Sequence, residues 1–285
     1  MEFSKPVTKV IVSRHSKRDY RNEALSDGLL EKVQAILSEN QKGFLGNCIE
    51  FKLIEKSSAI TNYKVKLGTY GFISGARYFI AGGVDLSKSY ILEDYGFLLE
   101  KIILQLTDLG LGTCWLGGTF NRADYSNFFD ADQKLVVPAI TPVGYPKPSK
   151  SIRENIIRWG AKSDSRKSWN ELFFDQQFGQ PLSESMAGVY QTPLEMLRLA
   201  PSASNKQPWR VVKNGSGFHF YLLETPGYDK TIKAVKLQRI DMGIAMSHFE
   251  TTCKEMHING SWQIQQPNIV SKHEQYLVSW ILTQN

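Results

Sequence analysis

The chain has 285 residues, of which 42% are hydrophobic and 12% aromatic, and its formal net charge is +6 at pH 7. This composition supports a sizeable core in one or two domains and excludes a globally disordered chain. Lysine and arginine are spread along the sequence without the long basic runs of a nucleic-acid arm or a polybasic membrane patch, so we expect neither partner. The positive balance suits a protein that holds a phosphorylated small molecule.

Cys48, Cys114 and Cys253 are widely separated and form no CxxC pair, which argues against a disulfide framework or a cysteine zinc site. The first twenty residues lack the apolar stretch of a signal peptide. The most apolar long stretch, from Tyr95 to Leu111, is interrupted by charged residues, whereas a membrane span needs roughly 20 mostly apolar residues. We therefore expect a cytoplasmic protein in which this stretch is a buried helix.

The hydrophobic pattern predicts helices and strands in alternation. In chain order, we expect a helix over 25–37, strands over 49–56 and 76–81, a helix over 93–111 and a strand over 136–143. A polar, linker-like stretch over 160–170 follows. After it we expect a helix over 192–199, strands over 209–213 and 217–224 joined by a turn, and a helix over 238–256.

The two main helices carry a concealed repeat. Asp94-Tyr95-Gly96 precedes Trp115 with the same spacing as Asp241-Met242-Gly243 precedes Trp262. The order of helix, strand and helix also matches, so we predict a gene duplication. The product would be two halves, 1–165 and 166–285, that fold as one unit and pack about a pseudo-twofold axis as the subunits of an isologous dimer do.

Three segments carry residues suited to ligand binding. In RHSKR (14–18), Arg14 and Arg18 supply fork-shaped cationic donors for phosphate and Ser16 adds a hydroxyl, although a solvated basic segment would have the same composition. In APSASNKQPW (200–209), two prolines end a helix and small residues allow a flat ligand to approach.

The third segment, GLGTCWLGGTF (110–120), follows the apolar helix. Glycine frees backbone N–H groups to face a ligand, but Gly110 or Gly112 also serves as an ordinary helix end. Gly117-Gly118 is not needed for that purpose. The segment is not a dinucleotide fingerprint, because it ends a helix and does not open one after a strand.

Other chemistries have no matching pattern. The histidines show no ligand spacing to one another and no HExxH is present, so we expect no metal site. No GxSxG nucleophile elbow supports serine hydrolysis. Asp94 and Asp241 are interpreted as helix-end or interface residues.

The three segments together resemble the FMN-dependent nitroreductase family. RHSKR resembles its R-[RH]-S-x-[RK] signature, APSASNKQPW its A-P-S-x-x-N-x-Q-P-W signature and GLGTCWLGG its G-L-G-T-C-W-[IL]-G pattern. Val143-Gly144-Tyr145-Pro146, followed by Lys150 and Arg153, is similar to its late G-Y-P…[KR] segment. The resemblance implies an α+β nitroreductase-like fold with a mixed, mainly antiparallel sheet flanked by helices.

The order of the motifs departs from the family. There, the PSxxN segment soon follows the Arg-Ser signature, but here residues 37–44 occupy that place and PSASN lies in the second half. The second half in turn lacks an Arg-Ser signature. The family binds FMN at a dimer interface, with the PSxxN loop supplied by the partner, and this division of labour maps onto the two halves of one chain. The sequence is therefore similar to the single-chain, two-half branch of nitroreductases, and we expect a monomer.

The resemblance implies the residues that bind FMN. Arg14, Ser16 and Arg18 would meet the phosphate and ribityl chain, His15 would present its backbone, and either Lys150 or Arg153 would complete phosphate neutralisation. Gly117 and Gly118 would line the ring near flavin N5. The other half would contribute Pro201, Ser202, Ala203, Ser204 and Asn205. A further family contact falls near Tyr70 and Gly71, where the usual Asn and Lys are absent.

The implied activity is an NAD(P)H nitroreductase. NAD(P)H would donate hydride to flavin N5, and the reduced flavin would pass electrons to a nitroaromatic, quinone or similar acceptor without an essential side-chain acid or base. Two alternatives remain: an FMN-binding protein that stores or senses flavin without turnover, and a relic that binds another phosphorylated ligand.

Overall fold

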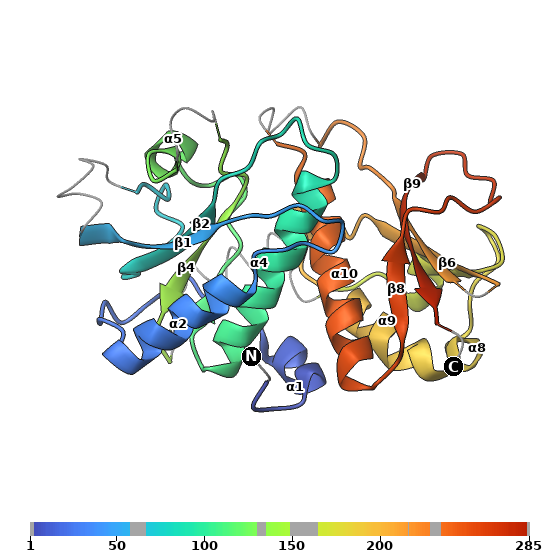
Figure 1. Ribbon diagram of the computed structural model, residues 1–285, viewed down its shortest axis with the longest axis horizontal. Helices are drawn as coiled ribbons and strands as arrows, with labels where there is room; N and C mark the ends of the chain where they lie inside the picture. The colour runs from blue at the N-terminus through green and yellow to red at the C-terminus, as the bar shows by residue number, and fades with distance from the viewer. Residues whose placement is uncertain are drawn as a thin grey trace.

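The computed structural model describes residues 3–57, 67–129, 135–148, 165–215, 217–228 and 235–283. Its two halves lie side by side, each with its own sheet, and the two longest helices run next to each other between them (Figure 1). This arrangement confirms the predicted α+β fold and the intrachain pseudo-dimer.

The first half contains a four-stranded antiparallel sheet in the order β1-β2-β4-β3. Its elements are α1 (Val7–Ser13), α2 (Asp27–Glu39), β1 (Phe51–Glu55), β2 (Tyr78–Gly82), α4 (Ile91–Asp108), β3 (Gly112–Thr113), α5 (Arg122–Ser126) and β4 (Ile140–Gly144).

The second half contains a five-stranded sheet in the order β5-β6-β7-β9-β8, in which only the β5–β6 pair is parallel. Its elements are α7 (Trp169–Leu172), β5 (Phe173–Asp175), α8 (Glu184–Ala187), α9 (Gln191–Arg198), β6 (Trp209–Asn214), β7 (Gly217–Leu222), α10 (Leu237–Glu255), β8 (Gly260–Gln263) and β9 (Gln275–Leu282). Short 3₁₀ turns lie at Gly188–Tyr190 and Ala203–Asn205.

The two sheets have the same topology once β5 is set aside. The order β1-β2-β4-β3 corresponds strand for strand to β6-β7-β9-β8. In each half a helix (α2 or α9) precedes the first of these strands and one long helix (α4 or α10) follows the second. The repeat inferred from the two DxG sequences is therefore visible in the fold.

The helices α4 and α10 form the centre of the molecule because nearly every side of each is buried. Tyr95, Leu99 and Ile103 of α4 are fully buried, as are Met246 and Phe249 of α10. A helix that is buried on all sides needs neighbours all round, and each of these has a sheet on one side and the other helix on another. One continuous hydrophobic cluster therefore runs through both halves.

The predicted elements are present, with shifted ends. The strand expected over 136–143 begins at Ile140, because Val136 forms only an isolated bridge to Val84. The first helix, α1, was not anticipated; Val7, Val10 and Ile11 pack one side of it against Leu104 and Met196. The long hairpin formed by β8 and β9 was also missed. Residues 160–164 of the linker expected over 160–170 lie outside the described residues, and α7 begins within that range at Trp169.

In the part of the chain that the structure describes, no helix is long and apolar enough to cross a membrane.

Candidate functional site

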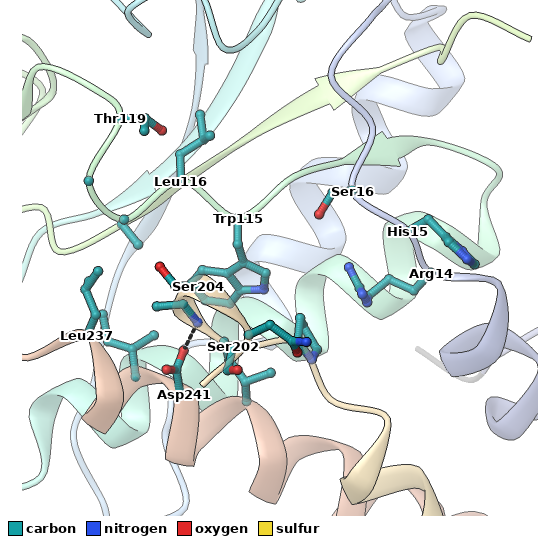
Figure 2. Close-up of a pocket in the computed structure, with 18 of the residues that line it drawn as sticks. Arg14, His15, Ser16, Trp115, Leu116, Thr119, Ser202, Ser204, Leu237 and Asp241 are labelled. Carbon is teal, nitrogen blue, oxygen red and sulfur yellow. Dashed lines mark hydrogen bonds between the residues drawn. The ribbon is translucent and has the colours of Figure 1, made fainter. Parts of the chain in front are cut away.

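A cavity of about 470 Å³ lies between the two halves (Figure 2). Its volume falls in the range of small-molecule and cofactor sites. Most of the residues expected from the sequence line it: Arg14, His15, Ser16, Arg18, Gly117, Gly118, Pro201, Ser202, Ala203, Ser204 and Asn205. The split motifs therefore meet in one place.

The RHSKR segment is fixed beside the glycine segment by strand-like pairing. Ser16 forms a parallel bridge with Thr113, and the Lys17 N–H donates to the Thr113 carbonyl at 2.8 Å. Gly112 leaves room for this approach, because a Cβ there would come within 3.1 Å of the Lys17 side chain. The close backbone contact sets the position of both arginines relative to the glycine loop.

The late GYPK segment pairs with the residues that directly follow RHSKR. Tyr20 bridges Pro146, and the Lys147 N–H donates to the Asp19 carbonyl at 2.9 Å. Lys150 and Arg153 lie outside the described residues. Their assignment to the phosphate stays a prediction.

Arg14 is held by a buried polar network. Its Nε lies 3.6 Å from Oε1 of Glu100 on α4. The Glu100 carboxylate also accepts from Trp115 Nε1 at 2.5 Å and contacts His248 Nε2 at 2.9 Å. The other ring nitrogen of His248 lies 2.9 Å from the Met196 carbonyl, which can only accept, so Nδ1 carries hydrogen. Both halves thus contribute to fixing one cavity-lining guanidinium.

Arg18 has unused donors. Its Nε and Nη1 are buried and have no hydrogen-bond partner among the described residues. A buried N–H group without an acceptor is costly, most of all on a charged group. An anionic ligand in the cavity that Arg18 lines would relieve this cost, and phosphate matches the fork geometry of a guanidinium.

The glycine loop is positioned by a residue that the sequence analysis did not single out. Arg122 Nη2 donates to the Gly117 carbonyl and, at 3.4 Å, to that of Pro138. Burial lowers the pKa of the Arg122 guanidinium from its ordinary value. On the other side, a Cβ on Gly117 would come within 2.9 Å of the Leu237 side chain, which also lines the cavity. Glycine therefore keeps the space between the two halves open.

The PSASN loop adopts a conformation that most residues avoid. Ser204, Asn205 and Gln207 have φ values of +49°, +52° and +49°. Strained backbone of this kind persists only where surrounding contacts hold it, and it clusters at functional sites. Here the Gln207 N–H donates to Ser202 Oγ at 2.9 Å, and the Ala203 N–H donates to Asp241 Oδ1 at 2.9 Å.

The Asn205 amide has a neighbour outside the motif. Its Nδ2 donates to the Ser165 carbonyl at 2.9 Å, and Arg166 of the same segment lines the cavity. The segment entering the second half thus borders the site, which the motif comparison did not predict.

Tyr70 and Gly71 are not among the residues that line the cavity. Tyr70 is 71% exposed, while the following Phe72 does line it. Additional lining residues that sequence reasoning missed include Trp115, Arg166, Tyr228, Leu237 and Asp241. Only Trp115 and Asp241 had a signal, since both belong to the repeated DxG…W pattern.

Within the described residues, no group of three His, Cys, Asp or Glu side chains is placed to hold a metal ion. The basic side chains, the glycine loop and the cross-half PSASN loop instead favour a phosphorylated ligand with a flat part.

The fold has a counterpart among known proteins. The sequence matches the profile of the family described as "Putative TM nitroreductase" over residues 6–253, so the chain belongs to that family. It is accordingly an oxidoreductase of the nitroreductase group. No curated protein sequence matches the chain.

Three solved structures illustrate the similarity. A "putative nitroreductase" from Thermotoga maritima MSB8 is 20% identical, with a TM-score of 0.61 over 99% of this chain and 96% of that one, which shows the same fold. A nitroreductase with bound FMN from Desulfitobacterium hafniense DCB-2 is 20% identical over 51% of this chain and 92% of that one, with a TM-score of 0.40. A nitroreductase family protein from Clostridium novyi NT is 22% identical over 64% and 97%, with a TM-score of 0.40.

Proposed function

We propose that the chain binds FMN in the cavity between its halves and acts as an NAD(P)H-dependent oxidoreductase on nitroaromatic, quinone or similar acceptors. The observation that carries the proposal is the joining of three separated motifs around one cavity, with unpaired buried donors on Arg18. Membership of the nitroreductase family supports it. The nitroreductase from Desulfitobacterium hafniense DCB-2 has bound FMN.

The residues present fit this cofactor. Arg18 has free donors for the phosphate, and Arg14 adds charge from a position fixed by Glu100. Ser16 lines the same end of the cavity, and Lys150 or Arg153 would complete the neutralisation. The glycines at 117 and 118 and the loop at 201–205 approach the cavity from opposite halves, which leaves room for a flat ring between them.

FMN, when bound, supplies the redox chemistry, accepting hydride from NAD(P)H and passing electrons to the acceptor. The protein binds it, orients it and keeps charge near it. Arg122 fixes the glycine loop through the Gly117 carbonyl, and Asp241 fixes the PSASN loop through Ala203. We expect no side-chain acid or base to be essential.

We also propose that the two halves, 1–165 and 166–285, arose by gene duplication and that the chain works as a monomer. One chain supplies both sides of the cavity, so no second copy is needed to complete it. A cytoplasmic setting agrees with three free cysteines, two of them buried.

The test is to purify the protein, record its visible absorbance, titrate it with FMN and follow NADH and NADPH consumption with a nitroaromatic. Saturable FMN binding with turnover supports the proposal. Binding without turnover of either nucleotide would make the chain a flavin-storing or flavin-sensing protein. A colourless protein whose titration shows no binding would point to another phosphorylated ligand.

A further inference from the structure

Asp241 lines the cavity, and only one of its two carboxyl oxygens has a hydrogen-bond partner among the described residues. The side chain is 3% exposed, and Oδ1 accepts from the Ala203 N–H of the PSASN loop. Oδ2 is buried and has no hydrogen-bond partner among the described residues. A buried polar atom without a partner requires an explanation, since leaving it unsatisfied costs about 1–3 kcal/mol.

The first half of the chain contains a corresponding aspartate, Asp94, and both of its carboxyl oxygens accept hydrogen bonds. Asp94 lies near the start of α4, which begins at Ile91, as Asp241 lies near the start of α10, which begins at Leu237. Its Oδ1 accepts from the Leu45 N–H at 2.9 Å, and its Oδ2 accepts from the N–H and the side-chain Nδ2 of Asn47 at 3.0 and 2.9 Å.

The loops bound by the two carboxyl groups correspond residue by residue. Leu45-Gly46-Asn47 matches Ala203-Ser204-Asn205: the first residue donates to the carboxyl group, the second has positive φ and the third is asparagine. Asn47 turns toward Asp94, whereas Asn205 donates to Ser165. In the second half, Asp241 Oδ2 thus lacks the internal donor that Asn47 supplies to Asp94 in the first half.

The spare oxygen belongs to a group that stays neutral near pH 7. Burial raises the pKa of Asp241 to about 8, and the Ala203 hydrogen bond offsets this only in part. A neutral carboxyl has one O–H donor, and with Oδ1 accepting from Ala203 that donor is on Oδ2.

We propose that Asp241 contacts the ligand, donating a hydrogen bond from Oδ2 to an acceptor atom on the flavin ring while Oδ1 holds the PSASN loop. Arg14 and His15 lie at the opposite side of the cavity from Asp241 and Leu237 (Figure 2). If the FMN phosphate binds at the Arg14 side of the cavity, the flavin ring therefore lies at the Asp241 side. This inference rests on the proposed binding of FMN.

Other ionisable groups lie on the described elements around Asp241. On α4, Glu93 is paired with Arg239 of α10, and the PSASN loop carries Lys206. The remaining ionisable residues that line the same cavity are Arg14, His15, Arg18, Arg166 and Tyr228. An Asp241 variant retains all of these groups. Any pH dependence of binding that they cause is therefore also present in the variant, and the difference from the wild type reports on Asp241.

The experiment measures the Kd of FMN and of riboflavin between pH 7 and 9.5 for the wild-type protein and for Asp241→Asn. Ionisation removes the Oδ2 donor but leaves Oδ1 as an acceptor for Ala203. We therefore expect the wild-type Kd for both flavins to rise severalfold with pH. Asn keeps an acceptor and a donor, so its Kd should lie within about threefold of the wild-type value at pH 7 and stay level at higher pH.

Asp94→Asn is the matched control. Both oxygens of Asp94 face donors, so the amide loses hydrogen bonds and lowers the melting temperature, while the pH profile of flavin binding stays like that of the wild type. A wild-type Kd that is level or falls with pH, or an Asp241→Asn variant that follows the wild-type profile, would overturn the inference and leave FMN binding intact. Absence of FMN binding by the wild-type protein would overturn both.

Discussion

Gly96 of α4 and Gly243 of α10 each face the backbone of the other helix. A Cβ on Gly96 would overlap the carbonyl oxygen of Ile240, and a Cβ on Gly243 would overlap that of Glu93. The same sequence offset separates Gly96 from Gly243 and Glu93 from Ile240, so the contact is reciprocal, as at an isologous interface. The glycine of each repeated DxG sequence thus lies where the two long helices cross in close contact.

Replacing either glycine with alanine should destabilise the protein through this crossing. The added methyl group meets backbone, which cannot turn aside, so we expect a loss of about 1–3 kcal/mol or more and a lower melting temperature. Gly28→Ala on α2 is the control: no atom lies within 4 Å of its Cβ, and alanine favours a helix. Melting temperatures unchanged in both Gly96→Ala and Gly243→Ala would contradict the crossing described here.

Arg18→Ala should weaken FMN far more than riboflavin. The variant removes donors that have no partner within the described protein, and a charge-assisted contact to phosphate contributes about 1.5–3 kcal/mol, or roughly tenfold to a hundredfold in Kd. Fluorescence quenching gives both constants. Arg21→Ala, at an exposed arginine three residues further along the chain, should leave both constants unchanged. Equal losses for the two flavins would place Arg18 away from the phosphate.

The stability of the protein should depend on pH through Asp241. Its pKa is about 8 in the folded state against an ordinary value of 3.8. Below pH 4 both states hold the proton and the group contributes nothing. Between pH 4 and 8 the unfolded chain ionises first, so stability falls as pH rises, and above about pH 8 the loss is complete.

Asp241→Asn removes this titration. The melting temperature of the variant relative to the wild type should therefore increase from pH 5 to pH 8 and then level off, which calorimetry of the two proteins measures directly. If the melting temperatures of the two proteins instead change in parallel across this range, the pKa of the Asp241 carboxyl is not raised.

Local patterns were sufficient to predict most elements and the parts of the site. The apolar stretch around Tyr95 predicted a buried helix because a helix so apolar needs cover on every side, and α4 has it. The cavity could be anticipated because RHSKR, GLGTCWLGG and PSASN each combine small or cationic residues in an unusual way. The sequence did not predict the helix α1, because seven residues are too few to show a clear helical period. Its buried side is defined by packing against Leu104 and Met196, which are distant in the sequence.

Contacts between residues that are distant in the sequence could not be predicted from local patterns. Nothing in the spacing of Arg122 indicates that it reaches back to the Gly117 carbonyl. Nor does the sequence indicate that Glu100 contacts both Arg14 and, across the two halves, His248. The correspondence of Asn47 with Asn205 was also hidden, because the loop around Asn47 has lost the proline and serine that mark the motif. Hydrogen bonds to a shared aspartate identified it instead.

The same correspondence predicts that each chain binds one FMN. Phe44 takes the place that Ser202 has in the PSASN loop, directly before the residue that donates to the aspartate. Its ring packs against Phe97 at 4.8 Å and against Trp262 of the other half at 5.2 Å between centroids. Aromatic side chains thus occupy the space related by pseudosymmetry to the cavity.

Titration of apo-protein with FMN should therefore saturate at one per chain, and a fragment of residues 1–165 should not bind, because it lacks the PSASN loop. Ser202→Phe copies the first half's residue into the cavity and should weaken FMN more than a hundredfold. Ser202→Ala is the matched control: it loses only the contact from the Gln207 N–H and should weaken FMN about tenfold or less. Two FMN per chain, or tight binding by Ser202→Phe, would show that the halves are functionally equivalent and that Phe44 does not close the second site.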